Sequence, residues 1–285
     1  MKKIIILGSG GMLGHMVCTY LNNTGKYIIK DVSYPTSFRS ESYILDITNK
    51  IAVEQYIFLE KPDIVINCIG ILIKGSILDP ANAIYINSYF PHALSKIVRE
   101  IGGRSVHIST DCVFSGKKGL YSESDSVDAA DIYGLSKALG EIYLNPDLTI
   151  RTSIIGPELK TNGEGLFHWF ILSDGKIHGY TKAFWTGVTT LELSKAIDAA
   201  IEQNLSGLYH LSNSIKISKN NLLNILKKIW NKSNIEIEPI EGKNVDKSLI
   251  TSRVDFKYQT PSYEKMLIEL RDFMIKNKSL YNQYF

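Results

Sequence analysis

Three side chains that could bind and protonate a substrate stand together in the stretch HISTDCVFSG (His107–Gly116). An apolar run ends abruptly there at the hydroxyl of Thr110, the carboxyl group of Asp111 and the thiol of Cys112. β-Branched residues favour strand interiors, and ligands of α/β proteins bind beyond the carboxyl ends of the strands. The stretch therefore predicts a strand that ends at a ligand site.

Cys112 allows two interpretations. Free cysteines are often buried and then act as small apolar side chains. A thiol also has a pKa of about 8.5, which makes it a competent proton donor. The residue type alone leaves both the packing role and the acid role open.

Tyr133 and Lys137 lie four residues apart in DIYGLSKALGE, on one face of a predicted helix. Of the 16 tyrosines, only Tyr133 has a lysine at this spacing. A phenol with a pKa of about 10 releases its proton reluctantly at pH 7, and a nearby ammonium lowers that pKa. With Thr110 holding a carbonyl oxygen, this set suits reduction of a ketone, in which the developing alkoxide needs a proton.

A glycine-rich loop, GSGGMLG, directly follows the first apolar run and opens a predicted helix. Its glycines, Gly8, Gly11 and Gly14, would allow a tight turn and a close approach of the backbone to a pyrophosphate. The helix N-terminus would supply free N–H groups. This context predicts a dinucleotide site that also includes Met12 and Leu13.

Two residues near the second strand bear on which dinucleotide binds. Asp31 could bind the ribose 2′-hydroxyl of NAD, whereas Arg39 could bind the 2′-phosphate of NADP. Further along, Asp46 is either a contact to the adenine, with Ile47 beside it, or an N-cap of the next helix.

The elements that must position these residues alternate along the chain. Continuous apolar strands separated by helices indicate parallel strands buried on both faces, and hence a doubly wound α/β sheet of the Rossmann type. We expect strands at Lys3–Leu7, Tyr27–Val32, Pro62–Gly70, Val106–Ile108, Leu148–Ile150 and Gly207–Leu211. We expect helices at Met12–Leu21, Ile51–Leu59, Ala83–Ile101, Ile132–Leu144, Leu191–Glu202, Asn220–Trp230 and Tyr263–Ile275. Residues 1–153 and 183–212 would form the nucleotide-binding domain, and residues 154–182 and 213–285 a smaller substrate-binding lobe.

Composition narrows the class of protein. With 285 residues, 44% hydrophobic and 21% charged, the chain resembles an ordinary globular protein, and a net charge of +3 argues against a nucleic-acid partner. The first apolar run ends at Leu7, too short for a secretion signal, and no stretch reaches the length of a membrane span. The three cysteines have no metal-type spacing. We expect a reduced, cytoplasmic protein without a metal, as a monomer or homodimer.

The motifs, taken in order, resemble the extended short-chain dehydrogenase/reductase family. Within it, STDCVFSGKKGLYSESD, YGLSKALGE and IRTSIIG are similar to the dTDP-4-dehydrorhamnose reductase branch, over residues 1–212. The resemblance implies a nicotinamide cofactor and a dTDP- or UDP-linked 4-keto-6-deoxyhexose as substrate. It gives the catalytic roles to Thr110, Tyr133 and Lys137. NADP(H) is favoured, because biosynthetic reductases of this kind commonly use it, and NAD(H) is the alternative.

The same resemblance implies contacts to both ligands from further residues. Those expected at the cofactor are Asn67, Cys68, Ile69 and Ser109. Those expected at the sugar nucleotide are Asn87, Asp111, Arg151, Ser153, His168, Trp185, Thr190 and Arg253.

The reductase branch usually has tyrosine where Cys112 stands. Bifunctional 3,5-epimerase/4-keto-reductases of the plant type carry cysteine there, which implies C3 epimerase activity beside reduction. Similar 4,6-dehydratases end this strand in Thr-Asp-Glu, and the missing glutamate argues against that activity. The lysine expected as the partner of the thiol has no clean match, and His168 is a substitute.

A second class of function is a binding module. A regulatory subunit of methionine adenosyltransferase resembles this branch and binds NADP without turnover. The complete set of Thr110, Tyr133 and Lys137 favours the enzyme.

Overall fold

An all-parallel sheet of seven strands forms the larger part of the protein, whose computed structural model describes residues 1–213 and 215–285. The strands, in spatial order, are β3 (Tyr43–Ile44), β2 (Ile28–Ser33), β1 (Lys3–Leu7), β4 (Ile64–Asn67), β5 (Arg104–Thr110), β6 (Leu148–Thr152) and β11 (Gly207–His210). Each neighbouring pair is parallel. The predicted doubly wound fold is confirmed. Because the strand order reverses between β1 and β4, a ligand crevice is expected at their carboxyl ends.

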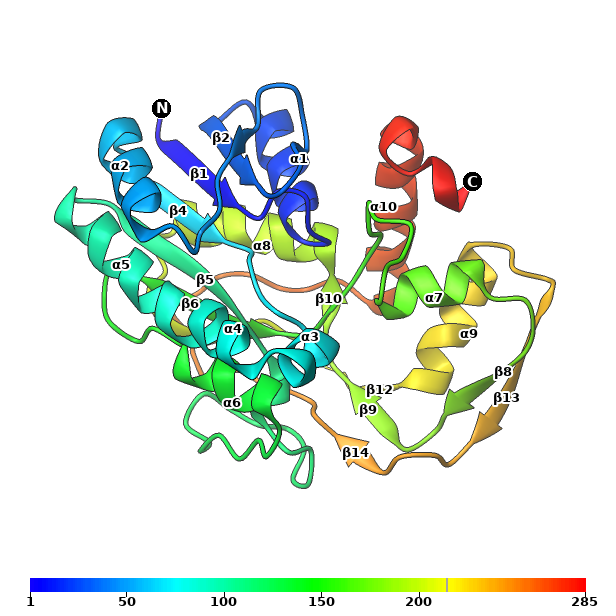
Figure 1. Ribbon diagram of the computed structural model, residues 1–285. Coiled ribbons are helices and arrows are strands. Elements are labelled where there is room, and N and C mark those ends of the chain that lie inside the picture. The colour runs from blue at the N-terminus through cyan, green and yellow to red at the C-terminus, as the bar shows by residue number, and fades with distance from the viewer. Residues whose placement is uncertain (214) are drawn as a thin grey trace.

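Helices cover both faces of this sheet (Figure 1). Along β1, Ile4 and Ile6 pack into one apolar cluster, and Ile5 and Leu7 pack into another. This alternation is the two-residue period of a strand buried on both sides. Helices α1 (Gly14–Thr24) and α8 (Thr190–Glu202) pack on the first face, and α2 (Lys50–Glu60) and α5 (Phe90–Glu100) on the second.

The predicted helix Ala83–Ile101 is divided into three segments. They are α4 (Pro80–Ile84), the π-helical segment η1 (Tyr85–Tyr89) and α5. A π segment adds a residue to one turn and redirects the side chains there, and such segments occur frequently at functional sites. The redirected residue here is Asn87, whose amide hydrogen-bonds both the N–H and the carbonyl of Ile71.

Helix α6 (Ile132–Leu139) ends five residues earlier than the predicted Ile132–Leu144. A Cβ at Gly140 would lie 1.8 Å from the carbonyl oxygen of Asn87, so the two segments are in direct backbone contact. The short α3 (Ile73–Leu78) packs beside it against α4.

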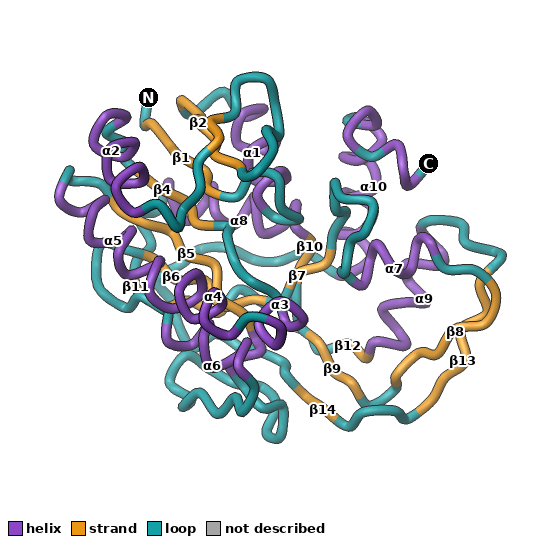
Figure 2. The backbone as a smooth tube through the Cα atoms, in the orientation of Figure 1, coloured by secondary structure: helices purple, strands orange, loops and turns teal. Residues whose placement is uncertain are grey.

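The smaller part of the molecule lies beside the carboxyl edge of the sheet (Figures 1 and 2). It contains α7 (Leu166–Leu172), α9 (Lys219–Ile229) and α10 (Tyr263–Lys276). Its strands are short: β8 (Gly175–Tyr180) pairs with β13 (Ile235–Ile240), and β7 (Ile154–Ile155) with β10 (Val188–Thr189). Strand β9 (Ala183–Trp185), predicted in the nucleotide-binding domain, instead pairs with β12 (Ile217–Ser218) and β14 (Val245–Asp246). Among the described residues, no helix is long and apolar enough to cross a membrane.

The C-terminal turns η3 (Lys278–Leu280) and η4 (Asn282–Tyr284) connect the two parts. The hydroxyl of Tyr281 lies 3.1 Å from Nε2 of His15 in α1. The hydroxyl of Tyr284 lies 2.7 Å from Nδ1 of His168 in α7 and accepts the N–H of Glu158. Burial lowers the pKa of His15 to about 4, so this imidazole stays neutral at pH 7.

Candidate active site

The glycine loop follows β1 at the point where the strand order reverses. Gly8 has φ +84°, and a Cβ at Gly14 would lie 2.0 Å from the carbonyl oxygen of Gly8. Within the described residues, no side chain caps the N-terminus of α1 at Leu13, and no acidic residue lies in its first turn. The loop therefore offers uncapped N–H groups and the positive end of a helix dipole, a combination that fits a pyrophosphate.

Two residues that were predicted to contact the cofactor, Ile69 and Met12, connect the glycine loop to neighbouring segments. Ile69, after β4, packs on Gly8, where an added Cβ would lie 2.8 Å from its Cγ1. Met12 reaches the second part of the protein, since a Cβ at Gly165 would lie 2.5 Å from its Cε. Beside Ile69, burial raises the pKa of Cys68 to about 12, so this thiol is not a nucleophile at neutral pH.

Strand β5 ends in a single turn of 3₁₀-helix, η2 (Asp111–Val113). The Thr110 hydroxyl donates to Oδ1 of Asp111 at 3.2 Å and accepts the N–H of Cys112 at 3.1 Å. The turn thereby gathers the three polar groups at the strand end. Burial raises the pKa of Asp111, and the ammonium groups of Lys247 and Lys219 oppose that rise.

Tyr133 reaches this turn because α6 begins directly against it. The side chain of Asp131 caps the helix by accepting the N–H of Gly134. A Cβ at Gly134 would lie 2.3 Å from the carbonyl oxygen of Cys112, so only glycine permits this approach. Burial raises the pKa of Tyr133, Cys112 adds to the rise, and the nearby hydroxyl of Thr110 opposes it. The expectation that Lys137 lowers this pKa is wrong, because burial of the phenol dominates.

Lys137 lies one helical turn further on and is buried between β5 and the segment after β4. Its ammonium donates to the carbonyl oxygen of Ile108 at 2.7 Å and lies 3.4 Å from Nε2 of His107. Burial lowers the pKa of Lys137 to about 8, and Glu141 and Cys68 oppose that shift. A Cβ at Gly70 would lie 4.0 Å from Nζ of Lys137, which places the ammonium at the crevice next to the glycine loop.

Two lysines of the second part face the turn at Cys112, and no sequence motif marked either of them. Burial raises the pKa of Cys112 to about 11, Asp111 adds to the rise, and nearby Lys247 opposes it. Burial lowers the pKa of Lys219, and the closeness of Asp111 and Cys112 opposes that shift. Nζ of Lys219 lies 4.9 Å from the centre of the Trp185 ring. Trp185, which was predicted to contact the sugar nucleotide, therefore lies near the turn at Cys112.

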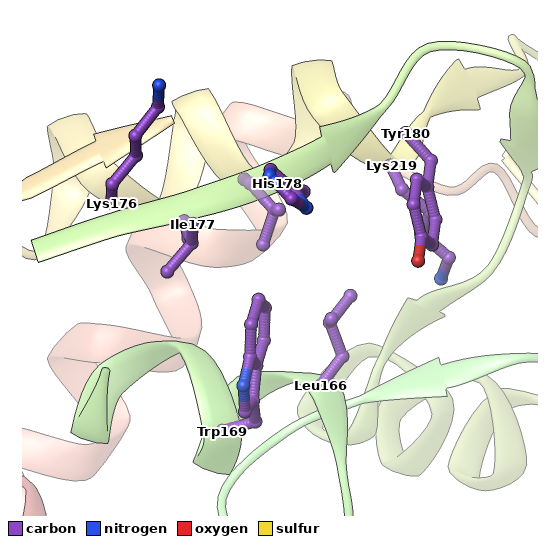
Figure 3. A pocket seen from close by; sticks show the side chains of 8 residues that line it. Leu166, Trp169, Lys176, Ile177, His178, Tyr180 and Lys219 are labelled. Atoms are coloured by element: carbon purple, nitrogen blue, oxygen red, sulfur yellow. The ribbon is translucent and has the colours of Figure 1, made fainter. Parts of the chain in front are cut away.

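Lys219 also lines a cavity of about 540 Å³ in the second part (Figure 3). The other lining residues are Leu166, Trp169, Lys176, Ile177, His178, Tyr180 and Leu223. Figure 3 shows Trp169 and Leu166 on one side and the residues of β8 on the other. Aromatic walls beside cationic groups suit an aromatic base and attached phosphates.

Several predicted ligand contacts are engaged within the protein instead. The Ser109 hydroxyl donates to Oε1 of Glu141 at 2.6 Å. Arg151 donates to both oxygens of the same carboxylate, at 2.7 and 2.6 Å, and both partners are buried. The side chains of Ser109 and Arg151 thus both hold Glu141 in this structure, and the cofactor contact of Ser109 and the sugar contact of Arg151 stay predictions.

Three further residues that were predicted to contact the sugar are buried or bonded within the protein. Thr190 is fully buried against Gly156, where an added Cβ would lie 2.2 Å from its Oγ1. Arg253 donates to the carbonyl oxygens of Ser206 and Leu208. His168 is buried against Tyr284. Arg253 thus ties the second part to β11, and the neighbours of Cys112 are lysines rather than His168.

The remaining predicted residues shape the crevice through their own hydrogen bonds. Oδ1 of Asn67 accepts the N–H of Ile69. Asn87 is fully buried and holds Ile71 and the hydroxyl of Ser136. Ser153 joins β6 to β7, and its carbonyl oxygen accepts the N–H of Val188.

Asp46 caps no helix. Its carboxylate accepts the N–H and the hydroxyl of Thr48, and Asn49 caps α2 instead. Ile47, predicted beside the adenine, is buried in the apolar cluster under α2 and α5. Of the two alternatives for Asp46, the N-cap is excluded by the structure.

The chain is similar to proteins of a known family. The family model described as RmlD substrate binding domain matches residues 1–253. A dTDP-4-dehydrorhamnose reductase of Aggregatibacter actinomycetemcomitans is 33% identical over 159 residues, which cover 54% of this chain and 51% of that protein. The spore coat polysaccharide biosynthesis protein SpsK of Bacillus subtilis is 27% identical over 220 residues, 75% of this chain and 74% of that protein. The chain thus spans about half the length of the first relative (51%).

Solved structures share the fold. A dTDP-4-dehydrorhamnose reductase of Bacillus anthracis in complex with NADP has a TM-score of 0.80 at 22% identity, covering 96% of this chain and 99% of that one. A UDP-N-acetylglucosamine 4-epimerase of Methanobrevibacter ruminantium also scores 0.80, at 16% identity, covering 97% and 99%. At such identities the likeness concerns the fold alone. The family model, however, matches most of the chain, and the chain therefore belongs to the RmlD substrate binding domain family.

Proposed function

We propose that this protein is an NADPH-dependent 4-keto-reductase of a nucleotide-linked 4-keto-6-deoxyhexose. The observation that carries the proposal is the meeting of Tyr133, Thr110 and Lys137 at the crevice where the strand order reverses, next to the glycine loop. The likeness to dTDP-4-dehydrorhamnose reductases, one of them in complex with NADP, supports it.

The bound cofactor would supply a hydride to the C4 ketone, and the residues of the chain do the remaining work. Thr110 holds the ketone oxygen, and Tyr133 donates the proton that the developing alkoxide needs. Burial raises the pKa of Tyr133, so the phenol is protonated at neutral pH, and the alkoxide, as the stronger base, can take this proton. The uncapped N-terminus of α1 and the glycine loop bind the pyrophosphate. Lys137 positions the cofactor at the end of β5.

The nucleotide end of the substrate would occupy the cavity lined by Trp169, Tyr180 and Lys219. A planar base can lie against the aromatic side chains, and the diphosphate can meet the ammonium groups. Both UDP- and dTDP-linked sugars satisfy this chemistry. A panel of such 4-keto-sugars, with products identified by mass spectrometry, distinguishes them.

Removal of the proton donor tests the proposal. Replacing Tyr133 with Phe should lower kcat by about 10² or more, because the phenol supplies the proton in the transition state. The affinity for NADPH should stay within about twofold of wild type, since the variant lacks only one oxygen. Unchanged turnover would overturn the assignment. A wild-type protein that binds NADPH but turns over no member of the panel would instead be a regulatory binding module.

We further propose C3 epimerase activity, supported by the closeness of Cys112 to both Tyr133 and Lys219. Protons next to a ketone exchange by the action of an acid and a base on opposite faces of the sugar. Cys112, with its pKa raised to about 11, stays protonated and can donate. The ammonium of Lys219, which comes from the other part of the protein, would stabilise the enolate that forms when the proton next to the ketone is released to water.

Substitution of Cys112 by Ser separates the two activities. A serine hydroxyl matches the thiol in shape but is far less acidic, so solvent deuterium incorporation next to the ketone should fall by on the order of 10². Reduction of a substrate that is already epimerised should survive. If the wild-type protein incorporates no deuterium, or if the variant slows both steps equally, Cys112 is a packing residue in a plain reductase.

A further inference from the structure

The end of β2 holds a buried ion pair beside the glycine loop. We infer that Asp31 is a positioning residue, which holds Arg39 toward the 2′-phosphate of NADPH and does not itself contact the ribose. This inference rests on the proposed NADPH-dependent function. It reverses the usual meaning of an acidic residue at this place, which is recognition of the ribose 2′-hydroxyl of NAD.

The contacts of Asp31 leave its carboxylate no room for a ligand. Its side chain is 1% exposed. Oδ1 accepts Nε and Nη2 of Arg39, at 3.1 and 2.5 Å. Oδ2 accepts the hydroxyls of Ser9 and Ser42, at 2.7 and 2.6 Å. Two hydrogen bonds on each oxygen fill the acceptor capacity of a carboxylate, so a ribose hydroxyl could bind only by displacing one of them.

Arg39, in contrast, keeps donors outside this pair. Asp31 engages Nε and one N–H of Nη2, which leaves the second N–H of Nη2 and both of Nη1. The nearest other acceptor for Nη1 is the exposed carboxylate of Glu41, at 3.4 Å. The Arg39 side chain is 23% exposed, so a phosphate can reach these donors from solvent.

The surrounding backbone sets where the free donors lie. The N–H groups of Gly8 and Ser9 both donate to the carbonyl oxygen of Val32, which ties the glycine loop to the end of β2. The N–H of Arg39 donates to Ser42, the same residue whose hydroxyl donates to Asp31. The guanidinium is thus held next to the loop that would bind the pyrophosphate. That is the position that the adenosine ribose occupies in dinucleotide sites of this fold.

The experiment uses two small probes of the full-length protein, 2′,5′-ADP and 5′-AMP, with dissociation constants measured by calorimetry. They differ only at the ribose 2′ position, which carries a phosphate or a hydroxyl. Wild type should bind 2′,5′-ADP more tightly. Arg39→Ala should weaken 2′,5′-ADP binding by on the order of tenfold to a hundredfold, the range for charged hydrogen bonds, and leave 5′-AMP binding unchanged.

The Asp31→Asn variant separates three roles by the sign of its effect. If Asp31 positions Arg39, 2′,5′-ADP binding weakens by about fivefold, and 5′-AMP binding is unchanged. If Asp31 merely repels the phosphate, removal of its charge tightens 2′,5′-ADP binding. If Asp31 contacts the ribose hydroxyl, 5′-AMP binding weakens. Either of the last two results overturns the inference.

Two milder variants test the same inference in case the Asp31→Asn protein does not fold. Ser42→Ala removes one hydrogen bond to the carboxylate and should weaken 2′,5′-ADP binding by about twofold to threefold with no effect on 5′-AMP. Glu41→Gln removes the exposed competitor of the phosphate and should tighten 2′,5′-ADP binding by about twofold. Unchanged affinities in both variants would overturn the inference. A wild-type protein that binds neither probe would refute the proposed dinucleotide function itself.

Discussion

The carboxyl edge of the sheet and the second part of the protein supply the two halves of the site in different ways. At the sheet edge, each chemical group is held by a close neighbour in sequence or by a neighbouring strand, as when Gly134 packs on the carbonyl of Cys112 and so starts the helix that carries Tyr133 beside the turn. In the second part, Lys219 and Lys247 come from segments that lie more than 100 residues from the end of β5 in the sequence. Nζ of Lys219 has no hydrogen bond or ion pair to the residues described. The comparison indicates a rigid catalytic edge facing a substrate-binding side that keeps unpaired charge for its ligand.

The largest effect that we expect is a loss of stability on breaking the buried ion pair between Arg151 and Glu141. In Arg151→Met, the carboxylate of Glu141 stays buried without its cation, which should cost about 3–5 kcal/mol of unfolding free energy. Urea and thermal unfolding measure this loss. Arg151→Met/Glu141→Leu should recover most of it, because no charge is then buried without a partner.

The same variant tests whether the sheet edge is only a rigid support. Where the Arg151→Met protein remains folded at low temperature, its KM for the sugar nucleotide should match wild type. A raised KM in the folded variant would show that Arg151 contacts the sugar.

In the second part of the protein, the Lys219→Met substitution should raise the KM for the sugar nucleotide by about tenfold. This is the usual range for the loss of one charged hydrogen bond. The affinity for NADPH should not change. Methionine keeps the length and the packing on Trp185, so the charge is what the variant removes. The control is Lys216→Met in the same segment, whose ammonium is already paired with Asp246. Equal effects of the two substitutions would contradict a specific role for Lys219.

A smaller effect is expected from pH. The pKa of Lys137 is lowered to about 8, so its ammonium is charged at pH 7 and loses its charge as the pH rises above 8. Affinity for NADPH should therefore fall by roughly threefold between pH 7 and pH 9, since the charged donor forms the stronger hydrogen bond. Fluorescence titration of NADPH measures this change.

Two variants identify the titrating group. Tyr133→Phe should keep the same pH dependence, because burial raises the pKa of Tyr133 away from this range. Lys137→Met should remove it. A pH dependence that persists in Lys137→Met would assign the effect to another group.

The parts of the molecule that could be predicted from sequence are those with local signals. The run Lys3–Leu7 is apolar at every position after the lysine, and it forms β1 with those bounds. The glycine loop and the end of β5 follow apolar strands directly, and parallel strands bring their ends to one edge. The π segment at Tyr85–Tyr89 could not be foreseen, because the apolar period of a helix continues through it.

The sequence does not show which charged side chains form ion pairs with one another. Whether Asp31 faces a ribose or Arg39 depends on the path of the loop between them, which no local pattern describes. Arg151 pairs with Glu141 because the chain turns back between α6 and β6. The pairing of β9 could not be predicted for a similar reason, since this short strand is stabilised by partners from distant segments.

The hydrogen bond between His15 and Tyr281 joins residues 266 positions apart, and this separation has a consequence for synthesis. The strand, loop and helix that carry His15 leave the ribosome well before the hydroxyl that contacts its Nε2, which belongs to a segment translated 266 residues later. Closing so long a loop is slow and entropically costly. The nascent chain therefore carries its phosphate-binding loop without this support until translation has passed Tyr281. We expect the affinity of this loop for a dinucleotide to rise once the segment around Tyr281 has been added and has folded against α1.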